Sequence, residues 1–284
     1  MRWLILSLFL AAAIGAAALA QPRSDLVKAQ LLADVSSVKP GEPFTVGLLL
    51  KIAPHYHVYW INPGDSGQAT SVKLSASPVS KIEPIQFPTP FKIELPGGLV
   101  NYGYENEVML LAKVAPPVNP KLDTTTMQLS ADVSWLVCNE TECIPGDAKL
   151  ALSLPINGSA TPENSALFKQ WQDQLPSPAK GDAEVDPPPS DLKIEASWPG
   201  MRDEAFSRIE WFPGNNDPLI IKDIKVTPSA TNVRVNARVE LPAGQKLQRN
   251  TIESVLGYTD SHGQRRGLSL SVPIKATASV DKGK

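Results

Sequence analysis

Cysteine is scarce in this sequence, which has only two, Cys138 and Cys143, among 284 residues. One pair excludes a small disulfide-rich scaffold, and a chain of this length can bury its own core without a covalent staple. An excess of charge of one sign is also missing, because 27 lysines and arginines stand against 29 aspartates and glutamates. This balance, together with the lack of a basic stripe, argues against a nucleic-acid partner.

Several familiar catalytic patterns are absent as well. The sequence has no glycine-rich phosphate loop, no defensible serine–histidine–acid arrangement and no paired-carboxylate motif. Four residues separate the two cysteines, so they do not form the Cys-x-x-Cys of a thioredoxin domain, and no alternation of strands and helices surrounds them. We therefore expect no bound cofactor.

Long hydrophobic runs are confined to the amino terminus, where residues 3–18 are apolar apart from Ser7. Arg2 precedes this run, and residues 18–20 close it with the small-x-small pattern of a signal peptidase site. The run of about 16 residues is short for a membrane-spanning helix of roughly 20 residues. We expect residues 1–20 to be a cleavable signal peptide and the mature protein to be exported; an uncleaved anchor is the alternative.

The rest of the chain favours β-strands over helices. Its 27 prolines separate short segments in which apolar residues alternate with period two, as in half-buried strands. This pattern predicts a two-sheet sandwich over residues 24–156. The clearest strands are predicted at 44–52, 71–74, 107–114, 126–135 and 148–154, with turns at 39–42, 62–65 and 96–98.

A change of composition marks residues 157–190. Thr161 followed by Pro162 is typical of a helix start, with threonine as the N-cap and proline at the first helical position. The proline-rich remainder predicts a linker. A helix over 162–175 would place three large apolar side chains on one face: Leu167, Trp171 and Leu175.

Strand-like alternation returns after the linker and is clearest at residues 232–241. It predicts a second β-sandwich over 191–276, followed by a polar tail over 277–284. The predicted fold class is therefore all-β, with two sandwiches joined by a short helix and a proline-rich linker.

The cysteine pair has three interpretations, and the first is a structural staple. A disulfide that closes a loop of about six residues removes little entropy from the unfolded chain. Its stabilisation is roughly 2 kcal/mol, against nearly 5 kcal/mol for a loop of about 100 residues. Short structural disulfides do occur in natural proteins, so the staple stays open as an alternative.

A metal site is the second interpretation. A closed zinc site would need two donors besides the cysteines, and the candidates are the three histidines His55, His57 and His262. His55 and His57 have the i, i+2 spacing that would put both rings on one face of a strand, where they could hold copper or zinc. Nothing in the sequence places them near Cys138, so we expect no metal at the cysteine pair.

A redox pair is the third interpretation. A predicted strand ends before Cys138 and its return begins near Lys149, which puts both cysteines at an accessible connection. Strained or exposed disulfides are the labile ones. The carboxylates of Glu140 and Glu142, between the cysteines, disfavour a thiolate. The pair is therefore better suited to be attacked first by the thiolate of a partner and then to pass its own electrons on.

Three motifs carry a resemblance to a known family: residues 57–67 (HVYWINPGDSG), residues 102–104 (YGY), and residues 135–138 together with 143–146 (WLVC and CIPG). They resemble the amino-terminal periplasmic domain of the DsbD/ScsB-type thiol:disulfide interchange proteins. Residues 255–258 and Gly267 look like the second extracytoplasmic domain of the ScsB branch. The resemblance therefore extends over the whole mature chain.

The resemblance implies an immunoglobulin-like sandwich that carries a reversible disulfide in the periplasm. In the family, this domain takes electrons from a membrane-embedded thiol reductase and passes them to exported thioredoxin-like proteins, which correct disulfides or support cytochrome c maturation. Carried over to this sequence, Cys143 would form the mixed disulfide with the recipient, and Cys138 would resolve it. Family members usually continue into a multi-span membrane region that this sequence does not contain. The donor is then a membrane-embedded thiol reductase on a separate polypeptide; the alternatives are another reductant and divergence into a binding module.

The family also shields its disulfide with a cap loop, which maps by its order along the chain to about residues 99–103. Better-known members have a phenylalanine at the tip of this loop, where Asn101 or Tyr102 stands here. His57 and Tyr59 are candidates to line the active face, with ordinary sandwich core as their alternative.

The competing function is a non-enzymatic extracytoplasmic binding module with a structural disulfide. Such a module would bind copper through His55 and His57. The two functions differ in what they require of the cysteine pair. Thiol–disulfide exchange needs an accessible disulfide, whereas the binding module does not.

Overall fold

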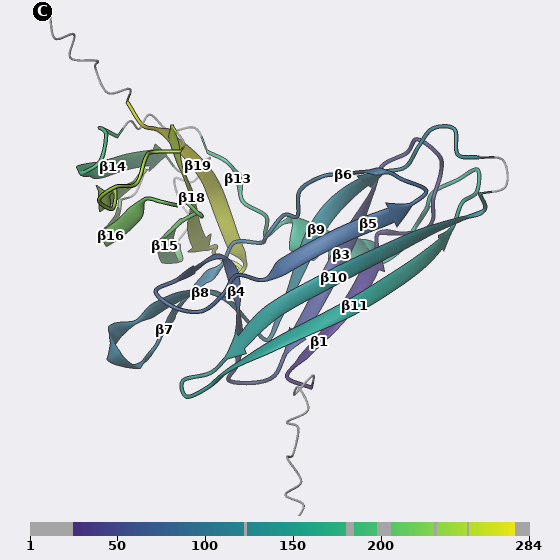
Figure 1. The fold of residues 1–284 in the computed structure, drawn as a ribbon, viewed down its shortest axis with the longest axis horizontal. Coiled ribbons are helices and arrows are strands. Elements are labelled where there is room, and N and C mark those ends of the chain that lie inside the picture. Colours follow the sequence, from purple (N-terminus) through teal and green to yellow (C-terminus); the bar gives the residue numbers. More distant parts are fainter. Residues whose placement is uncertain are drawn as a thin grey trace, which may run out of the picture.

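The computed structural model describes residues 25–121, 124–179, 185–197, 206–229, 232–248 and 250–275, and β-strands make up most of them (Figure 1). The predicted signal peptide (1–20) and polar tail (277–284) lie outside the described residues. Among the residues that are described, no helix has the length and apolar character needed to cross a membrane.

The first domain is a sandwich of two sheets. One sheet has four strands in the order β1 (Val27–Ala33), β3 (Phe44–Ile52), β9 (Glu107–Ala115) and β6 (Lys81–Ile82). The strand predicted at 44–52 is confirmed at its bounds, because its apolar residues are buried almost without interruption.

The other sheet of the first domain holds the cysteines. Its order is β11 (Cys143–Pro155), β10 (Thr126–Cys138), β4 (His57–Gly64), β8 (Val100–Glu105) and β7 (Phe91–Glu94), with β5 (Ser71–Ser77) paired to β10 beside β4. The short 3₁₀ helix η1 (Pro96–Gly98) joins β7 to β8. The turn predicted at 62–65 is wrong in part, because β4 continues to Gly64 with a register shift after Tyr59.

The first core lies between these two sheets. Alternate residues of β10, including Leu129 and Val133, point inward and are almost fully buried, as are Leu48 and Leu50 of β3. Burying one such side chain stabilises the fold by about 1.5–3 kcal/mol. The alternation recognised in the sequence is therefore the inward face of the sandwich.

The helix predicted at 162–175 is shorter than expected. Thr161 and Pro162 form a two-residue strand, β12 (Thr161–Pro162), which pairs with β2 (Val35–Ser37), and α1 (Ser165–Gln172) begins only after it. The predicted N-cap at Thr161 is therefore wrong, because pairing with a distant strand takes precedence over the local capping signal. The predicted apolar face is confirmed for the two residues that lie in α1, since Trp171 is buried and Leu167 packs against the first core. Leu175 lies beyond the end of α1, although it packs against the same core.

The second domain is another sandwich with a core of its own. One sheet has the order β13 (Ser177–Pro178), β19 (Arg265–Pro273), β18 (Thr251–Thr259) and β15 (Ser207–Pro213). The other has the order β14 (Ser190–Ser197), β17 (Asn232–Glu240) and β16 (Ile220–Pro228). Part of the predicted linker contributes here, because β13 pairs with β19 and Val185 bridges to Ile274. The predicted class, all-β with two sandwiches, is confirmed.

The two sandwiches meet through an apolar contact. Phe212 of β15 is fully buried, and its ring packs edge-on against Trp60 and Tyr102 of the first domain, with centroid distances of 6.1 and 5.2 Å. Beside these rings, the side-chain amide of Asn62 donates a hydrogen bond to the carbonyl oxygen of Pro213 at 2.8 Å. The second domain therefore packs directly against β4, which pairs with β10 of the cysteine hairpin, and against β8, which pairs with β4.

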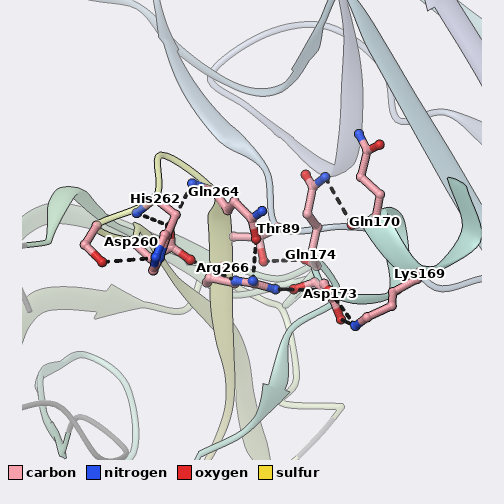
Figure 2. A network of polar contacts seen from close by, with 10 residues as sticks. Thr89, Lys169, Gln170, Asp173, Gln174, Asp260, His262, Gln264 and Arg266 are labelled. Atoms are coloured by element: carbon pink, nitrogen blue, oxygen red, sulfur yellow. Dashed lines mark hydrogen bonds and ion pairs between the residues drawn. The ribbon is translucent and has the colours of Figure 1, made fainter. Parts of the chain in front are cut away.

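A polar network joins the end of α1 to the second domain (Figure 2). Arg266 Nη1 donates to the carbonyl oxygen of Asp173 at 2.6 Å, and its Nε donates to the Asp260 carboxylate at 3.1 Å. The hydroxyl of Thr89, in the first domain, donates to the carbonyl oxygen of Gln174 at 2.9 Å. The residues that follow α1 therefore hydrogen-bond with both sandwiches.

Candidate redox site at the tip of a β-hairpin

The two cysteines close the hairpin formed by β10 and β11. These strands pair without interruption from Thr126 opposite Pro155 to Cys138 opposite Cys143. The Cα atoms of the cysteine pair lie 4.1 Å apart, and the two sulfurs are bonded. The prediction that the pair lies at a strand connection is confirmed.

Asn139 organises the four-residue turn between the cysteines. Its side-chain oxygen accepts hydrogen bonds from the backbone N–H groups of Thr141 and Glu142 at 2.8 and 2.9 Å, and from the Thr141 hydroxyl at 3.0 Å. Sequence analysis missed this role, although asparagine commonly bonds to the backbone two residues further on in a turn. The turn is therefore ordered by its own side chain as well as by the disulfide.

The expectation that both cysteines are accessible is wrong for Cys138, because the two cysteines differ sharply in exposure. Cys138 is only 1% exposed, whereas Cys143 lies on the exposed side of the edge strand β11. A thiol exchanges with a disulfide by direct attack on one sulfur, so access decides which sulfur is attacked. This geometry favours attack at Cys143 and departure of Cys138.

A buried polar chain leads away from Cys138 beneath the turn. His57 of β4 is the register partner of Cys138, and its Nε2 lies 3.2 Å from the Tyr59 hydroxyl. The Asn101 side-chain Nδ2 donates to the same hydroxyl at 3.3 Å, and the Asn101 side-chain Oδ1 accepts from the Ser66 hydroxyl at 3.0 Å. Three of the candidate residues, His57, Tyr59 and Asn101, are therefore brought together next to the cysteine hairpin.

Burial keeps this chain uncharged. It lowers the pKa of His57 below its ordinary value and raises the pKa of Tyr59 above its ordinary value. Burial disfavours the charged form of each group, so both side chains are neutral near pH 7. The chain can hold hydrogen bonds beneath Cys138 without placing a charge there.

Tyr102 is not brought to the cysteine hairpin. Its side chain projects from the face of β8 opposite to that of Asn101, and its ring packs against Phe212 of the second domain. Burial, with a smaller contribution from the charge of Asp65, raises the pKa of Tyr102 to about 12. This candidate belongs to the domain contact.

The segment beside the cysteine turn is also different from the one expected. A pocket of about 460 Å³ adjoins the turn, and its opposite wall is formed by residues 93–95, at the end of β7, and not by residues 99–103. Figure 1 shows the β7–β8 hairpin next to the β10–β11 tip. The pocket is lined by His55, His57, Ile93, Glu94, Leu95, Glu105, Asn139, Glu140 and Thr141.

The expected pair of histidine ligands does not form on a strand. His55 precedes β4 in a turn with a left-handed backbone (φ 68°), so it does not share a strand face with His57. His262 lies in the second domain, where its backbone N–H donates to Asp260. Within the part of the chain that the structure describes, no group of three or more histidine, cysteine, aspartate or glutamate side chains lies close enough to hold a metal ion.

Comparison with known proteins places this site in context. The sequence model of the family described as "Thiol:disulfide interchange protein DsbD, N-terminal" matches residues 23–155. Comparison with curated proteins gives no match.

Two solved structures resemble this one. The N-terminal periplasmic domain of ScsB from Proteus mirabilis is 19% identical, with a TM-score of 0.63 over 90% of this chain and 96% of that chain. The N-terminal domain of DsbD from Neisseria meningitidis, in its reduced form, is 14% identical, with a TM-score of 0.32 over 51% of this chain and 96% of that chain. At this identity, the likeness to ScsB shows a shared fold that includes both sandwiches.

Proposed function

Because residues 23–155 form a DsbD/ScsB-type N-terminal domain, a thiol:disulfide interchange module with a disulfide, we propose that this protein relays electrons through Cys138 and Cys143. The donor is a membrane-embedded thiol reductase, and the acceptors are exported thioredoxin-like proteins. The relay takes place in the periplasm, to which residues 1–20 direct the chain as a signal peptide. Its products serve disulfide correction and cytochrome c maturation.

The unequal exposure of the two cysteines is the observation that supports this proposal most strongly. Cys143 is exposed on β11, while Cys138 is almost fully buried. A bond that only braced the hairpin would not need one accessible sulfur. The arrangement supports the proposal that a partner attacks Cys143 and that Cys138 resolves the mixed disulfide.

Reduction of the pair follows from this assignment. A thiolate of the reductase attacks Sγ of Cys143, the sulfur–sulfur bond breaks, and Cys138 leaves as a thiolate that takes up a proton. The second thiolate of the reductase then attacks the other reductase sulfur, the one bonded to Cys143 in the mixed disulfide. This step releases Cys143 as a thiolate, and the reductase is left oxidised by two electrons.

Transfer to the acceptor uses the same bonds in the opposite direction. Cys143 attacks the disulfide of a thioredoxin-like protein and forms a mixed disulfide, while one acceptor sulfur leaves as a thiolate. Cys138, after losing its proton, attacks Cys143, restores the internal disulfide and releases the acceptor as a dithiol. His57, Tyr59 and Asn101 support the strand that positions Cys138 during these steps.

A trapping experiment tests the assignment. In Cys138→Ala the resolving thiol is gone, so a mixed disulfide between Cys143 and an exported thioredoxin-like protein should accumulate on a non-reducing gel after acid quenching. The matched control, Cys143→Ala, keeps only the buried cysteine and should trap far less. The absence of any mixed disulfide in Cys138→Ala, or equal trapping by both variants, would contradict the proposal.

A further inference from the structure

The segment that connects β6 to β7 is held by the second domain. Thr89, in this segment, is 1% exposed, and its backbone N–H donates to the carbonyl oxygen of Gln174 at 2.9 Å. Its side chain lies against Gly257 and Gly267, which face each other on β18 and β19. A Cβ on Gly267 would come within 2.2 Å of the Thr89 hydroxyl oxygen. The two glycines therefore form a recess in the second domain that receives Thr89.

Arg265 binds the same segment one residue further on. Its Nε and Nη2 donate to the carbonyl oxygen of Pro90 at 3.0 and 2.7 Å, and its guanidinium lies 4.7 Å from the centre of the Phe91 ring. Nη2 also pairs with the Glu210 carboxylate at 2.6 Å, and Nη1 donates to the carbonyl oxygen of Arg208 at 2.8 Å.

Because Arg265 is buried, few other residue types could replace it in these contacts. Its side chain is 2% exposed, and a buried guanidinium needs a partner for each of its donors. Burial lowers the pKa of Arg265 to about 10, so the group is charged at neutral pH. Few other residue types could satisfy the carbonyl of Pro90, the ring of Phe91 and the carboxylate of Glu210 at once.

The segment that Arg265 holds runs straight into the wall of the redox pocket. Phe91 is the first residue of β7, and Leu95, just beyond its end, lines the pocket beside the cysteine turn. Four residues of extended chain span about 13 Å. The start of β7 at Phe91, which Arg265 holds, and the pocket wall at residues 93–95 are therefore parts of one short strand. We call Pro90 and Phe91 the root of β7.

Few other contacts fix the outer side of β7. It is the last strand of its sheet, and among the described residues only β8 pairs with it. A groove of about 620 Å³ separates its Lys92 and Glu94 from Ile224 and Val226 of β16. Short edge strands with so few partners are held weakly along their length.

We propose that Arg265 is a positioning residue for thiol–disulfide exchange at Cys143. Through Arg265 and the glycine recess, the second domain fixes the root of β7, and thereby sets where residues 93–95 stand beside the cysteine turn. This surface adjoins residues 139–141 of the turn between the cysteines, so a protein partner that reaches Cys143 docks on it, whereas a small thiol does not need it. The inference rests on the proposed function, to which it adds a role for the second domain.

The test uses the full chain with Arg265→Met, which keeps much of the length and apolar character of the side chain and removes its charge and donors. Reduction of the disulfide is followed with two reductants, dithiothreitol and reduced thioredoxin. Arg265→Met should raise the KM for thioredoxin about threefold to tenfold, since a misplacement of about 1 Å costs up to 10²-fold. The dithiothreitol rate should stay within about twofold. Amide hydrogens of residues 92–95 should exchange faster in the variant.

The control is Arg234→Met, which removes an exposed arginine–glutamate pair with Glu195 elsewhere in the second domain and should change none of these readouts. Thr89→Val, which removes one hydroxyl hydrogen bond, provides a milder second variant if Arg265→Met does not fold. It should shift the same readouts in the same direction by a smaller factor.

Each contrary result has a distinct meaning. Unchanged amide exchange at residues 92–95, an unchanged KM for thioredoxin, or equal changes with both reductants would overturn the positioning role and leave the redox function in place. If thioredoxin reduces the unmodified protein no faster than dithiothreitol does at equal thiol concentration, the proposed function itself fails, and the positioning role fails with it.

Discussion

Removal of the disulfide should cost little stability, and the cost can be worked out from the hairpin. The bond closes a loop of six residues, from Cys138 to Cys143, and the chain-entropy relation gives about 2 kcal/mol for such a loop. The folded hairpin does not depend on the bond either, since twelve further residue pairs join β10 to β11. The reduced protein should therefore keep its fold.

The stabilisation of about 2 kcal/mol also determines how much folding shifts the reduction potential of the cysteine pair. A bond that stabilises the folded state by about 2 kcal/mol makes the folded disulfide about 40 mV more reducing than the same pair in the unfolded chain. A shift of this size is too small to turn an exchangeable disulfide into a permanent one.

Urea unfolding of the oxidised protein and of a Cys138→Ala/Cys143→Ala double variant measures this cost. The free energy of unfolding of the first domain should fall by about 2 kcal/mol, with an unchanged slope against urea. The reduced wild type in excess dithiothreitol serves as a second comparison without substitutions. A loss above about 4 kcal/mol, or loss of the β-sheet signal, would show that the bond braces the sandwich.

Three further predictions concern the surroundings of the cysteine hairpin. Burial lowers the pKa of His57 in the folded state, so the unfolded chain binds more protons just below the ordinary value of 6.5. The free energy of unfolding should therefore fall as the pH drops from about 7 to 5. In His57→Gln this fall, measured by urea titrations at both pH values, should be smaller. Tyr59→Phe removes the hydroxyl shared by His57 and Asn101, so it should cost about 1–3 kcal/mol in chemical denaturation, and an unchanged midpoint would contradict the buried chain. A Cβ on Gly146 would lie 2.5 Å from the indole nitrogen of Trp135, so Gly146→Ala should lower stability by about 1–3 kcal/mol, whereas the control Gly158→Ala, with nothing within 4 Å of its Cβ, should not.

The parts of the fold that depend on local pattern were predictable. The β-strand at 44–52 and the inward face of β10 follow from apolar periodicity, and the cysteine hairpin follows from the two strands that flank it. The family resemblance was carried by motifs of up to eleven residues and is confirmed for the first domain by the match over residues 23–155.

The parts that depend on distant pairing were not predictable from the sequence. Thr161 carries a sound capping signal, yet it pairs with β2, which lies more than 120 residues earlier. Residues 99–103 were expected to form the cap by their order along the chain. Asn101 does lie beside the cysteine hairpin, but residues 93–95, at the end of β7, form the pocket wall next to the turn. Tyr102 was drawn into the site by the same reasoning, and only the packing of Phe212 from the second domain shows where its ring lies.

The reduction potential of the Cys138–Cys143 bond tests the central claim most directly. Equilibration of the full chain with glutathione buffers, followed by thiol alkylation and mass spectrometry, gives this value. An electron relay requires a potential less negative than about −300 mV, so that partners can both reduce and reoxidise the pair. A value well below about −300 mV would identify a structural staple and contradict the account.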